Sequence, residues 1–172
     1  MKRTLTYITL IIAYLIFSCN NISSQVTLFH GATKAVTGKV IKVSDGDTFT
    51  LLMDVNTKMR IRMHGIDAPE MKGSQPYCKV SKEFLEEMIA GKWVSVDIKS
   101  IDRYKRYIGM VRTKTIKDVN LEMLKAGMAW HYNKYDHTPS YYLAEKKARL
   151  NKIGLWKDKN PINPAQWRKK RK

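Results

Sequence analysis

The sequence predicts an α+β fold that is mainly β, with five strands and three helices in one domain. Two features of the chain predict it. Short runs that are rich in β-branched residues, or that alternate apolar and polar residues, are bounded by turn residues as strands are. Longer stretches carry apolar residues at helical spacing, one after the third strand and two after the fifth. At 172 residues, the chain can bury one sizeable hydrophobic core.

The first three strands are expected close together in the chain. Residues 36–43 are rich in β-branched side chains and stop at the strong turn dipeptide Asp45-Gly46. Residues 48–55 and 58–64 form the next two strands, with a short turn between them. Three consecutive strands joined in this way make an antiparallel meander.

A helix and two further strands come next. Ser74 is expected to cap a helix that presents one apolar stripe and ends at Gly91. Residues 93–98 alternate apolar and polar side chains as a half-buried strand does. Residues 107–112 form its partner across a charged turn at residues 102–106.

Two more helices close the domain. Asp118 is a good N-cap for a short helix that ends at Gly127. Thr138-Pro139 opens the last helix, which stops near Gly154. A helix inserted after the third of five strands is the arrangement of an OB-fold barrel, a closed sheet that often binds nucleic acid. The same order of elements also fits other α+β folds.

The N-terminal segment has the features of a secretory signal. Lys2 and Arg3 precede the apolar residues 10–17, a stretch too short to span a bilayer comfortably. The tetrapeptide IFSC then resembles a bacterial lipobox, in which Cys19 becomes the lipidated first residue of the mature chain. We therefore expect a protein of the cell envelope that is lipid-anchored to a membrane outside the cytoplasm, or else one that is secreted.

The mature chain is strongly basic. Removing residues 1–18 takes away two cations and no acid, so the net charge falls from +17 to +15. Such an excess favours polyanions such as nucleic acid, although it also fits an anionic membrane surface or simple solubility. The chain is thereby divided into a signal peptide at 1–18, a flexible tether at 19–35, a folded domain at 36–167 and a disordered basic tail at 168–172.

One short run, IRMHGIDAPE, contains the residue types that hydrolysis of a phosphodiester requires. It supplies Arg62 as a cation for phosphate, Asp67 as an oxygen ligand for a hard metal, and Glu70 as a carboxylate that can act as a base. The upstream turn DGDT adds Asp47, a second hard oxygen donor. Asp47 follows the first turn and Asp67 ends the third strand, and these two strand ends can lie side by side in a barrel. The two runs together predict a nuclease.

Each run has a simpler explanation when it is taken alone. DGDT is also an ordinary hairpin turn. It resembles the start of an EF-hand loop, but no bidentate Glu or flanking helix follows at the required spacing. A lone Arg or an exposed Glu is most often a solvated surface residue. The four histidines form no pair at zinc-ligand spacing, which argues against a histidine-metal nuclease.

Several motifs of the chain resemble the staphylococcal nuclease family. Besides the two runs above, they are DRYKRYIG at residues 102–109, GMAWHYNKY at 127–135, GLW at 154–156 and PAQW at 164–167, all in the family's order. The similarity spans residues 36–167. It implies an OB fold and a Ca²⁺-dependent nuclease that hydrolyses DNA and RNA by metal-assisted attack of water.

The resemblance also implies roles for individual residues. Asp47 and Asp67 are the implied side-chain metal ligands. Ala68 supplies a backbone carbonyl ligand at a position where the best-known member of the family has Thr. Glu70 acts as the general base or orients the attacking water, two roles that the sequence does not separate.

Arg62 and Arg106 are the implied phosphate clamps, because a planar guanidinium can hold two phosphate oxygens. In residues 59–63 apolar and basic residues interleave, which places Arg62 on one face of its strand. The family turn within DRYKRYIG usually contains a Gly that this chain lacks. Arg103 or Lys105 is therefore an alternative to Arg106.

Two tyrosines are implied to contact the terminal base or the phosphate. They are Tyr132 and Tyr135, although packing within the protein would also account for both. Asn133 stands where the best-known member has Tyr, which favours Tyr135 over Tyr132.

The predicted function is that of a Ca²⁺-dependent nuclease that acts on DNA and RNA as a monomer, without a protein partner. The alternative is a catalytically silent OB module that only binds nucleic acid at the cell envelope. The chain retains all five implied side chains, which argues against the silent module: Asp47, Arg62, Asp67, Glu70 and Arg106.

Overall fold

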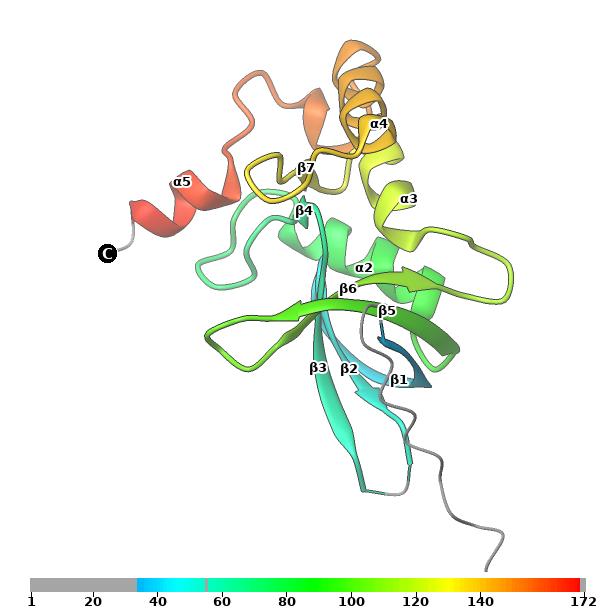
Figure 1. Cartoon of the computed structure of the whole chain (residues 1–172). Coiled ribbons are helices and arrows are strands. Elements are labelled where there is room, and N and C mark those ends of the chain that lie inside the picture. The colour runs from blue at the N-terminus through cyan, green and yellow to red at the C-terminus, as the bar shows by residue number, and fades with distance from the viewer. Residues whose placement is uncertain (1–33, 55, 171–172) are drawn as a thin grey trace, which may run out of the picture. The chain divides into compact units, whose positions relative to one another are not determined.

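A computed structural model describes residues 34–54 and 56–170 of the chain. The long strands are β1 at Lys34–Asp45, β2 at Thr48–Leu52, β3 at Lys58–Met63, β5 at Trp93–Ile101 and β6 at Tyr107–Arg112. They close into a barrel in the order β1, β2, β3, β6, β5 (Figure 1). β3 pairs with β6 in parallel, and the other neighbouring strands are antiparallel. The predicted α+β fold with a five-stranded OB barrel is confirmed.

Five strand ends differ from the prediction by one to three residues: both ends of β1 and the C-terminal ends of β2, β3 and β5. β1 continues to Asp45, and shifts in its register against β2 accommodate the added length. β2 ends at Leu52, before the predicted residue 55. The carboxylate of Asp54 accepts hydrogen bonds from the backbone N–H groups of Asn56 and Thr57, at 3.1 and 2.8 Å, and these bonds form the turn to β3.

Four α-helices lie in the described part of the chain, one more than predicted. They are α2 at Cys78–Ile89, α3 at Val119–Lys125, α4 at Pro139–Leu150 and α5 at Pro164–Lys169, with a 3-10 helix, η1, at Gly154–Lys157. The additional helix is α5. It includes Arg168 and Lys169, so the disorder expected at these two residues is not found. None of the helices described is long and apolar enough to cross a membrane.

Local capping signals explain where these helices begin. Asp118 caps α3 as predicted, because its carboxylate accepts a hydrogen bond from the N–H of Leu121 at 2.9 Å. Pro139 opens α4, also as predicted. The prediction for Ser74 was wrong, since α2 begins only at Cys78. Ser74 has a φ of 53°, which is not the extended conformation of an N-cap residue.

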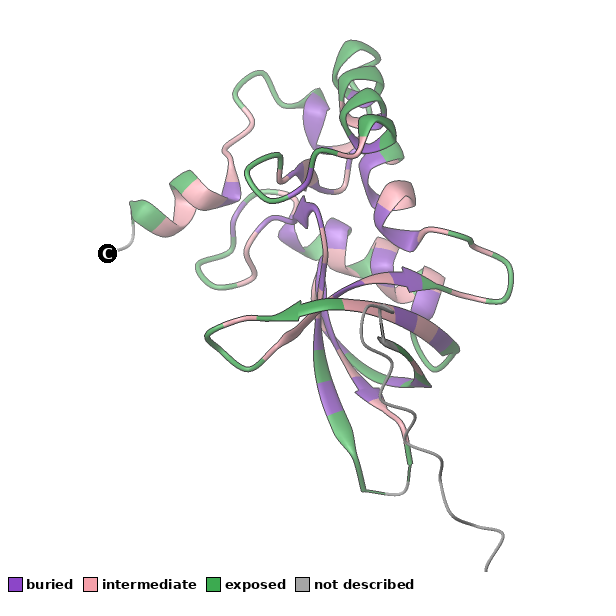
Figure 2. Cartoon of the chain, in the orientation of Figure 1, coloured by how far each residue is buried: buried purple, intermediate pink, exposed green. Residues whose placement is uncertain are grey.

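The core fills the barrel and extends to the helix α2. Because strand side chains alternate between faces, Phe49 on β2 and Ile61 on β3 point inward and are fully buried (Figure 2). α2 packs against β1 and contributes Leu85 and Ile89 to the same core. The alternation leaves the half-buried Arg62 on the other face of β3, where the candidate site lies.

Gly127 packs against the backbone that precedes η1. Its φ of +63° favours glycine, and a Cβ at this position would lie 2.3 Å from the carbonyl oxygen of Ile153. The carbonyl of Gly127 also accepts a hydrogen bond from the N–H of Leu155 at 2.9 Å. The backbones therefore approach too closely for any larger residue.

We expect Gly127→Ala to lower the free energy of unfolding by about 2–4 kcal/mol, since left-handed strain and a backbone clash act together. Gly91→Ala is the matched control, because Gly91 has a φ of +69° but nothing within 4 Å of its added Cβ. The control should lose only about 1–2 kcal/mol. Denaturant unfolding of both variants measures the difference, and equal losses would contradict the clash.

Candidate active site

Two buried carboxylates meet at one end of the barrel. Asp47 precedes β2, and Asp67 lies in the short strand β4 (Ile66–Asp67), which pairs with β7 (Trp130–His131). Both residues are 2% exposed. The N–H of Met63, at the end of β3, donates to the carbonyl of Asp47 at 2.8 Å, so the two strand ends lie side by side as expected. Asp67 belongs to β4, however, and not to the end of β3.

Arg62 lies between the two carboxylates. Its Nη1 forms an ion pair with Asp47 Oδ1, and its Nη2 donates to Asp67 Oδ1 at 2.6 Å. Its side chain is only 12% exposed, so one cation and two anions are buried together. Removing one partner from such a group is costly, because the remaining charges lose their compensation. Arg62 therefore holds Asp47 and Asp67 close to each other.

The DGDT turn and the Ala68 backbone support Asp47. Its Oδ2 accepts a hydrogen bond from the N–H of Ala68 at 2.6 Å, and its Oδ1 accepts one from the hydroxyl of Thr48 at 3.0 Å. The N–H of Asp47 donates to Asp45 Oδ1 at 3.1 Å. Burial raises the pKa of Asp45, against the opposing effects of the Arg62 charge and of hydrogen bonds from Thr48. The turn is thus a polar network as well as a chain reversal.

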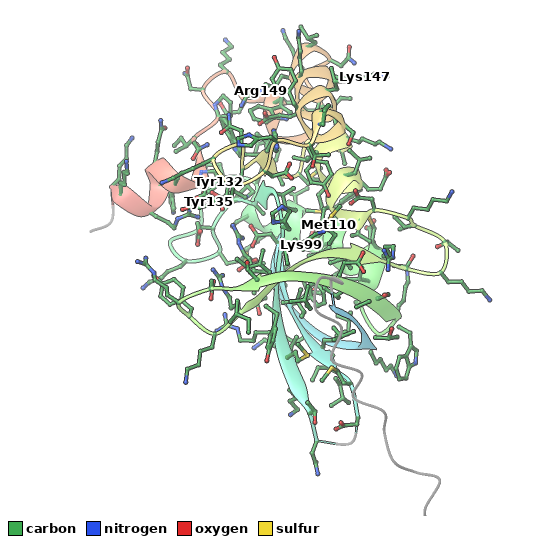
Figure 3. The ribbon with its side chains drawn as sticks, viewed as in Figure 1. Lys99, Met110, Tyr132, Tyr135, Lys147 and Arg149 are labelled. Carbon is green, nitrogen blue, oxygen red and sulfur yellow. The ribbon has the colours of Figure 1, made fainter. Side chains whose placement is uncertain are left out.

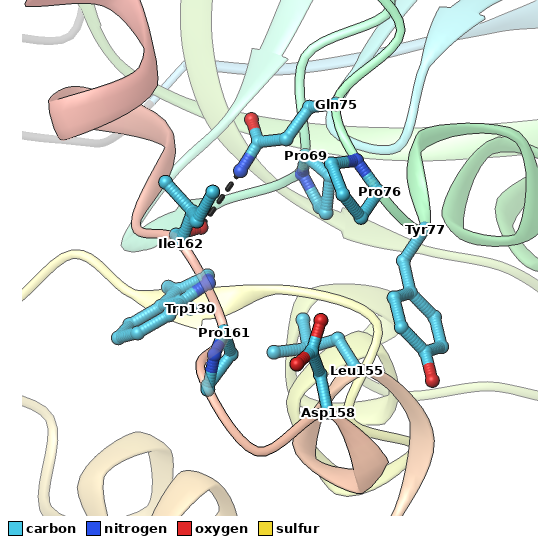
Figure 4. Close-up of a pocket in the computed structure, with 9 residues that line it drawn as sticks. All are labelled: Pro69, Gln75, Pro76, Tyr77, Trp130, Leu155, Asp158, Pro161 and Ile162. Carbon is cyan, nitrogen blue, oxygen red and sulfur yellow. Dashed lines mark hydrogen bonds between the residues drawn. The ribbon is translucent and has the colours of Figure 1, made fainter.

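Glu70 is attached to the C-terminal segment through a buried amide. The N–H of Glu70 donates to Gln75 Oε1 at 2.9 Å, and Gln75 Nε2 donates to the carbonyl of Ile162 at 2.7 Å (Figure 4). Gln75 is 2% exposed, whereas the side chain of Glu70 is 28% exposed. The backbone of Glu70 is therefore fixed while its carboxylate reaches solvent.

Arg168 of α5 also binds the carboxylates, which the sequence analysis did not predict. Its Nη1 and Nη2 donate to Asp67 Oδ1 at 3.1 Å and to Asp67 Oδ2 at 2.9 Å, and Nη1 also donates to Glu70. Burial acts to lower the pKa of Arg168, but the hydrogen bonds and charges of Asp67 and Glu70 outweigh it, so the pKa is raised. The signal that could have revealed this helix is Asn163-Pro164, a cap residue followed by Pro at the first helical position.

Arg106 lies in the turn between β5 and β6. The carboxylate of Asp102 accepts a hydrogen bond from the backbone N–H of Arg106 at 2.9 Å. It also binds Nε and Nη2 of the Arg106 side chain, at 2.8 Å each. Burial acts to raise the pKa of Asp102, but the hydrogen bonds from Arg106 outweigh it, so the pKa is lowered. Lys105 has a φ of +60°, the conformation that Gly would favour. Arg103 is exposed and stacks on the Tyr104 ring at 4.8 Å. Of the two arginines in this turn, Arg106 is the one whose guanidinium is fixed by a carboxylate.

A groove of about 1030 Å³ connects these side chains. Tyr132 and Tyr135 lie on it and pack edge to face, with ring centres 4.8 Å apart (Figure 3). The ring of Tyr135 is largely exposed. Charged and aromatic residues line the groove, including Asp45, Asp47, Glu70, Arg60, Arg62, Arg103, Arg106, Arg168 and Tyr104. A basic, aromatic groove of this kind suits a nucleic acid strand.

A metal at the two buried aspartates would need further oxygen ligands. Within residues 34–54 and 56–170, no group of three or more His, Cys, Asp or Glu side chains could hold a metal ion. His64 and His131 both face Asp136, with N to O distances of 3.4 and 2.9 Å, and so belong to a separate cluster. Asp47 and Asp67 offer hard oxygen donors side by side, which fits Ca²⁺ completed by a backbone carbonyl, water and phosphate.

The barrel places the carboxylates and arginines of the site together, and comparison with known proteins identifies the class of protein as a nuclease. The sequence model of a family described as "Staphylococcal nuclease homologue" matches residues 60–158. An uncharacterized endonuclease of Haemophilus influenzae is 43% identical over 136 residues, which are 79% of this chain and 75% of the relative. An uncharacterized endonuclease of Escherichia coli is 40% identical over 131 residues, 76% of this chain and 84% of the relative. The chain belongs to the staphylococcal nuclease family.

A plant relative extends the comparison. A staphylococcal-like nuclease of Arabidopsis thaliana is 40% identical over 117 residues, which are 67% of this chain and 35% of the relative. Asp47 and Arg168 lie outside the residues that the family's sequence model matches, whereas Arg62, Asp67 and Arg106 lie within them.

Proposed function

We propose that the protein is a Ca²⁺-dependent endonuclease that hydrolyses phosphodiester bonds of DNA and RNA, acting as a monomer without a protein partner. One observation carries the proposal: Arg62, Glu70 and Arg106 line a single groove, next to the buried pair of Asp47 and Asp67. Arg62, Asp67 and Glu70 come from the single run 61–70, and Asp47 and Arg106 come from two other segments of the chain. Metal-assisted hydrolysis of a phosphodiester uses a phosphate-binding cation, a base and a metal site together, and this juxtaposition of arginines and carboxylates supports the proposal.

The side chains divide the chemistry among them. Arg62 and Arg106 bind the non-bridging phosphate oxygens, and these contacts strengthen as negative charge grows in the transition state. Glu70 accepts a proton from the attacking water, or orients that water for attack at phosphorus. Tyr132 and Tyr135 contact the terminal base or phosphate, since aromatic rings stack on any base.

Asp47, Asp67 and the carbonyl of Ala68 would hold the metal. When bound, Ca²⁺ would neutralise charge on the phosphate and orient water. Mg²⁺ should serve poorly, because its strict octahedral shell suits a site with only two carboxylates less well.

Asp47→Asn should weaken Ca²⁺ binding by at least about tenfold, because affinity depends on the number of charged ligands. Calorimetric titration of the purified variant measures this loss. Asp54→Asn is the control, since Asp54 is exposed and belongs to the turn before β3. Unchanged affinity in Asp47→Asn would assign DGDT to a purely structural turn.

The proposed function is tested by incubating the purified protein with DNA and RNA, in Ca²⁺ and in a chelator. We expect both polymers to be cut only when Ca²⁺ is present. Cleavage that persists under chelation would contradict the metal requirement. Binding without cleavage in both conditions would support a catalytically silent OB module instead.

We also propose that the mature chain is anchored to a membrane of the cell envelope through Cys19, which lies outside the described residues. The lipobox-like tetrapeptide and the polar tether after it support this. One acyl chain binds membranes only weakly, whereas a cysteine that carries two or three chains attaches stably. Wild type should therefore sediment with membranes and Cys19→Ser should not, with mass spectrometry of the N-terminus as the check. An unmodified, soluble wild-type chain would indicate a secreted nuclease.

A further inference from the structure

Arg168 occupies the carboxylate oxygens that a metal would need. Its Nη2 lies 2.9 Å from Asp67 Oδ2 and its Nη1 lies 3.1 Å from Asp67 Oδ1, and Nη1 also donates to Glu70. Asp67 Oδ1 accepts a second hydrogen bond from Arg62. Both oxygens of this proposed ligand therefore already bind cationic donors.

Both oxygens of the other proposed ligand are also occupied, one of them by a cation. Asp47 Oδ1 binds Arg62 and the Thr48 hydroxyl, and Asp47 Oδ2 accepts the N–H of Ala68. A divalent cation that entered this group would be repelled by both guanidinium groups. The repulsion is strong because the carboxylates are buried, where charges are poorly screened. At least one arginine must move away before the metal can bind.

Of the two arginines, Arg168 is the one that can leave. Its side chain is 38% exposed, against 12% for Arg62. Arg62 stands on β3, which is paired on both sides in the closed barrel, whereas Arg168 stands on α5, a helix of six residues near the C-terminus. The neighbouring residue Trp167 attaches α5 to the rest of the domain, because its Nε1 donates to the carbonyl of Lys72 at 3.3 Å. The helix can therefore stay in place while the side chain of Arg168 moves.

We propose that Arg168 competes with the metal for Asp67 and Glu70, so that metal binding displaces the Arg168 side chain toward the groove. The inference rests on the proposed function, because it takes Asp67 as a metal ligand. In this proposal Arg168 is a positioning residue. It lowers the affinity for the metal, and it keeps the Glu70 carboxylate in an ion pair until the metal is bound. The displaced guanidinium stays beside the groove, where a phosphate backbone passes.

The test compares Ca²⁺ titration of the purified wild type, Arg168→Gln and Lys170→Gln by calorimetry. Arg168→Gln should bind Ca²⁺ about tenfold more tightly, as expected for a coupling between two competing cations. Lys170→Gln removes the same charge from an exposed residue two positions further on, and should keep the wild-type affinity. Arg168→Lys keeps the charge but cannot bridge two carboxylates, so its affinity should lie between the other two.

Thermal unfolding supplies a second readout that does not depend on catalysis. Arg168→Gln leaves Asp67 and Glu70 without their shared cation, so its Tm without Ca²⁺ should fall below that of wild type. Saturating Ca²⁺ should restore the Tm to the wild-type value. A lower Tm that Ca²⁺ does not restore would contradict the competition and give Arg168 a structural role.

The outcomes separate this inference from the proposed function. If wild type binds Ca²⁺ and Arg168→Gln binds it no more tightly, the competition is wrong and the metal site stands. If Lys170→Gln tightens binding as much as Arg168→Gln, general charge explains the effect and the competition is again wrong. If none of the variants binds Ca²⁺, the proposed metal site fails and the competition fails with it.

Discussion

Glu70→Gln is expected to lower kcat by about 10²–10⁴-fold, the contribution of a positioned general base, while Ca²⁺ binding is retained. Gln has nearly the shape of Glu but cannot accept a proton at neutral pH. The backbone N–H of Glu70 is held by Gln75 Oε1 at 2.9 Å, which does not involve the substituted side chain. The loss should therefore be chemical and not a loss of fold.

Single-turnover cleavage of a short DNA at saturating Ca²⁺ measures this effect. Glu83→Gln is the control, because Glu83 is exposed on α2. Wild-type turnover in Glu70→Gln would exclude both roles.

The barrel was predictable because its signals are local. β-branched runs, alternation and turn dipeptides each lie within a few residues, and the carboxylate cap at Asp118 is a short-range hydrogen bond. The prediction for Ser74 failed because long-range contacts decided the conformation there. Gln75, its neighbour, is buried between Glu70 and Ile162, and this contact joins segments that are far apart in the sequence. The preference of Ser for helix N-cap positions contains no information about such a long-range contact.

The candidate site was predictable only in part. Residue types and a family resemblance were enough to select Asp47, Arg62 and Asp67, and closure of the barrel explains why they meet. Strand alternation predicts only the face of the sheet on which Arg62 lies. It does not predict that Arg62 binds both aspartates. Arg168 was missed because a basic cluster at a chain end resembles a solvated tail, and only the folded structure shows that α5 returns to Asp67.

The β5–β6 turn shows how an unfavourable backbone conformation is accommodated. Lys105 adopts a φ of +60°, a conformation that favours glycine, at an energetic cost of about 1–2 kcal/mol. Asp102 compensates by accepting hydrogen bonds from the N–H groups of Tyr104 and Arg106, at 2.8 and 2.9 Å. Because the pKa of Asp102 is lowered, the stabilisation by its carboxylate is fully present above the usual pKa of Asp and is lost as the pH falls through the lowered value.

Arg106→Lys is expected to lower kcat by about 10²–10³-fold, although the charge is kept. Nε and Nη2 of Arg106 both bind Asp102 Oδ2, which fixes the guanidinium plane at the edge of the groove. A lysine has one compact ammonium group and cannot hold the carboxylate and two phosphate oxygens in this way. The charge that grows on phosphate would then lose a donor whose orientation is already set.

Arg103→Lys is the matched comparison in the same turn. Arg103 is exposed, and the contacts of its guanidinium in the described part of the chain are with Tyr104. The guanidinium lies 4.8 Å from the centre of the Tyr104 ring and donates to the Tyr104 hydroxyl at 2.8 Å. Because an exposed cation acts mainly on association and lysine keeps its charge, kcat should change by less than about threefold, and any change in KM should appear at low salt, where exposed charges are least screened. A severe effect at Arg103 with a mild one at Arg106 would make Arg103 the phosphate contact. With Arg106 held by Asp102 and Arg103 held only by an exposed ring, we expect the severe effect at Arg106.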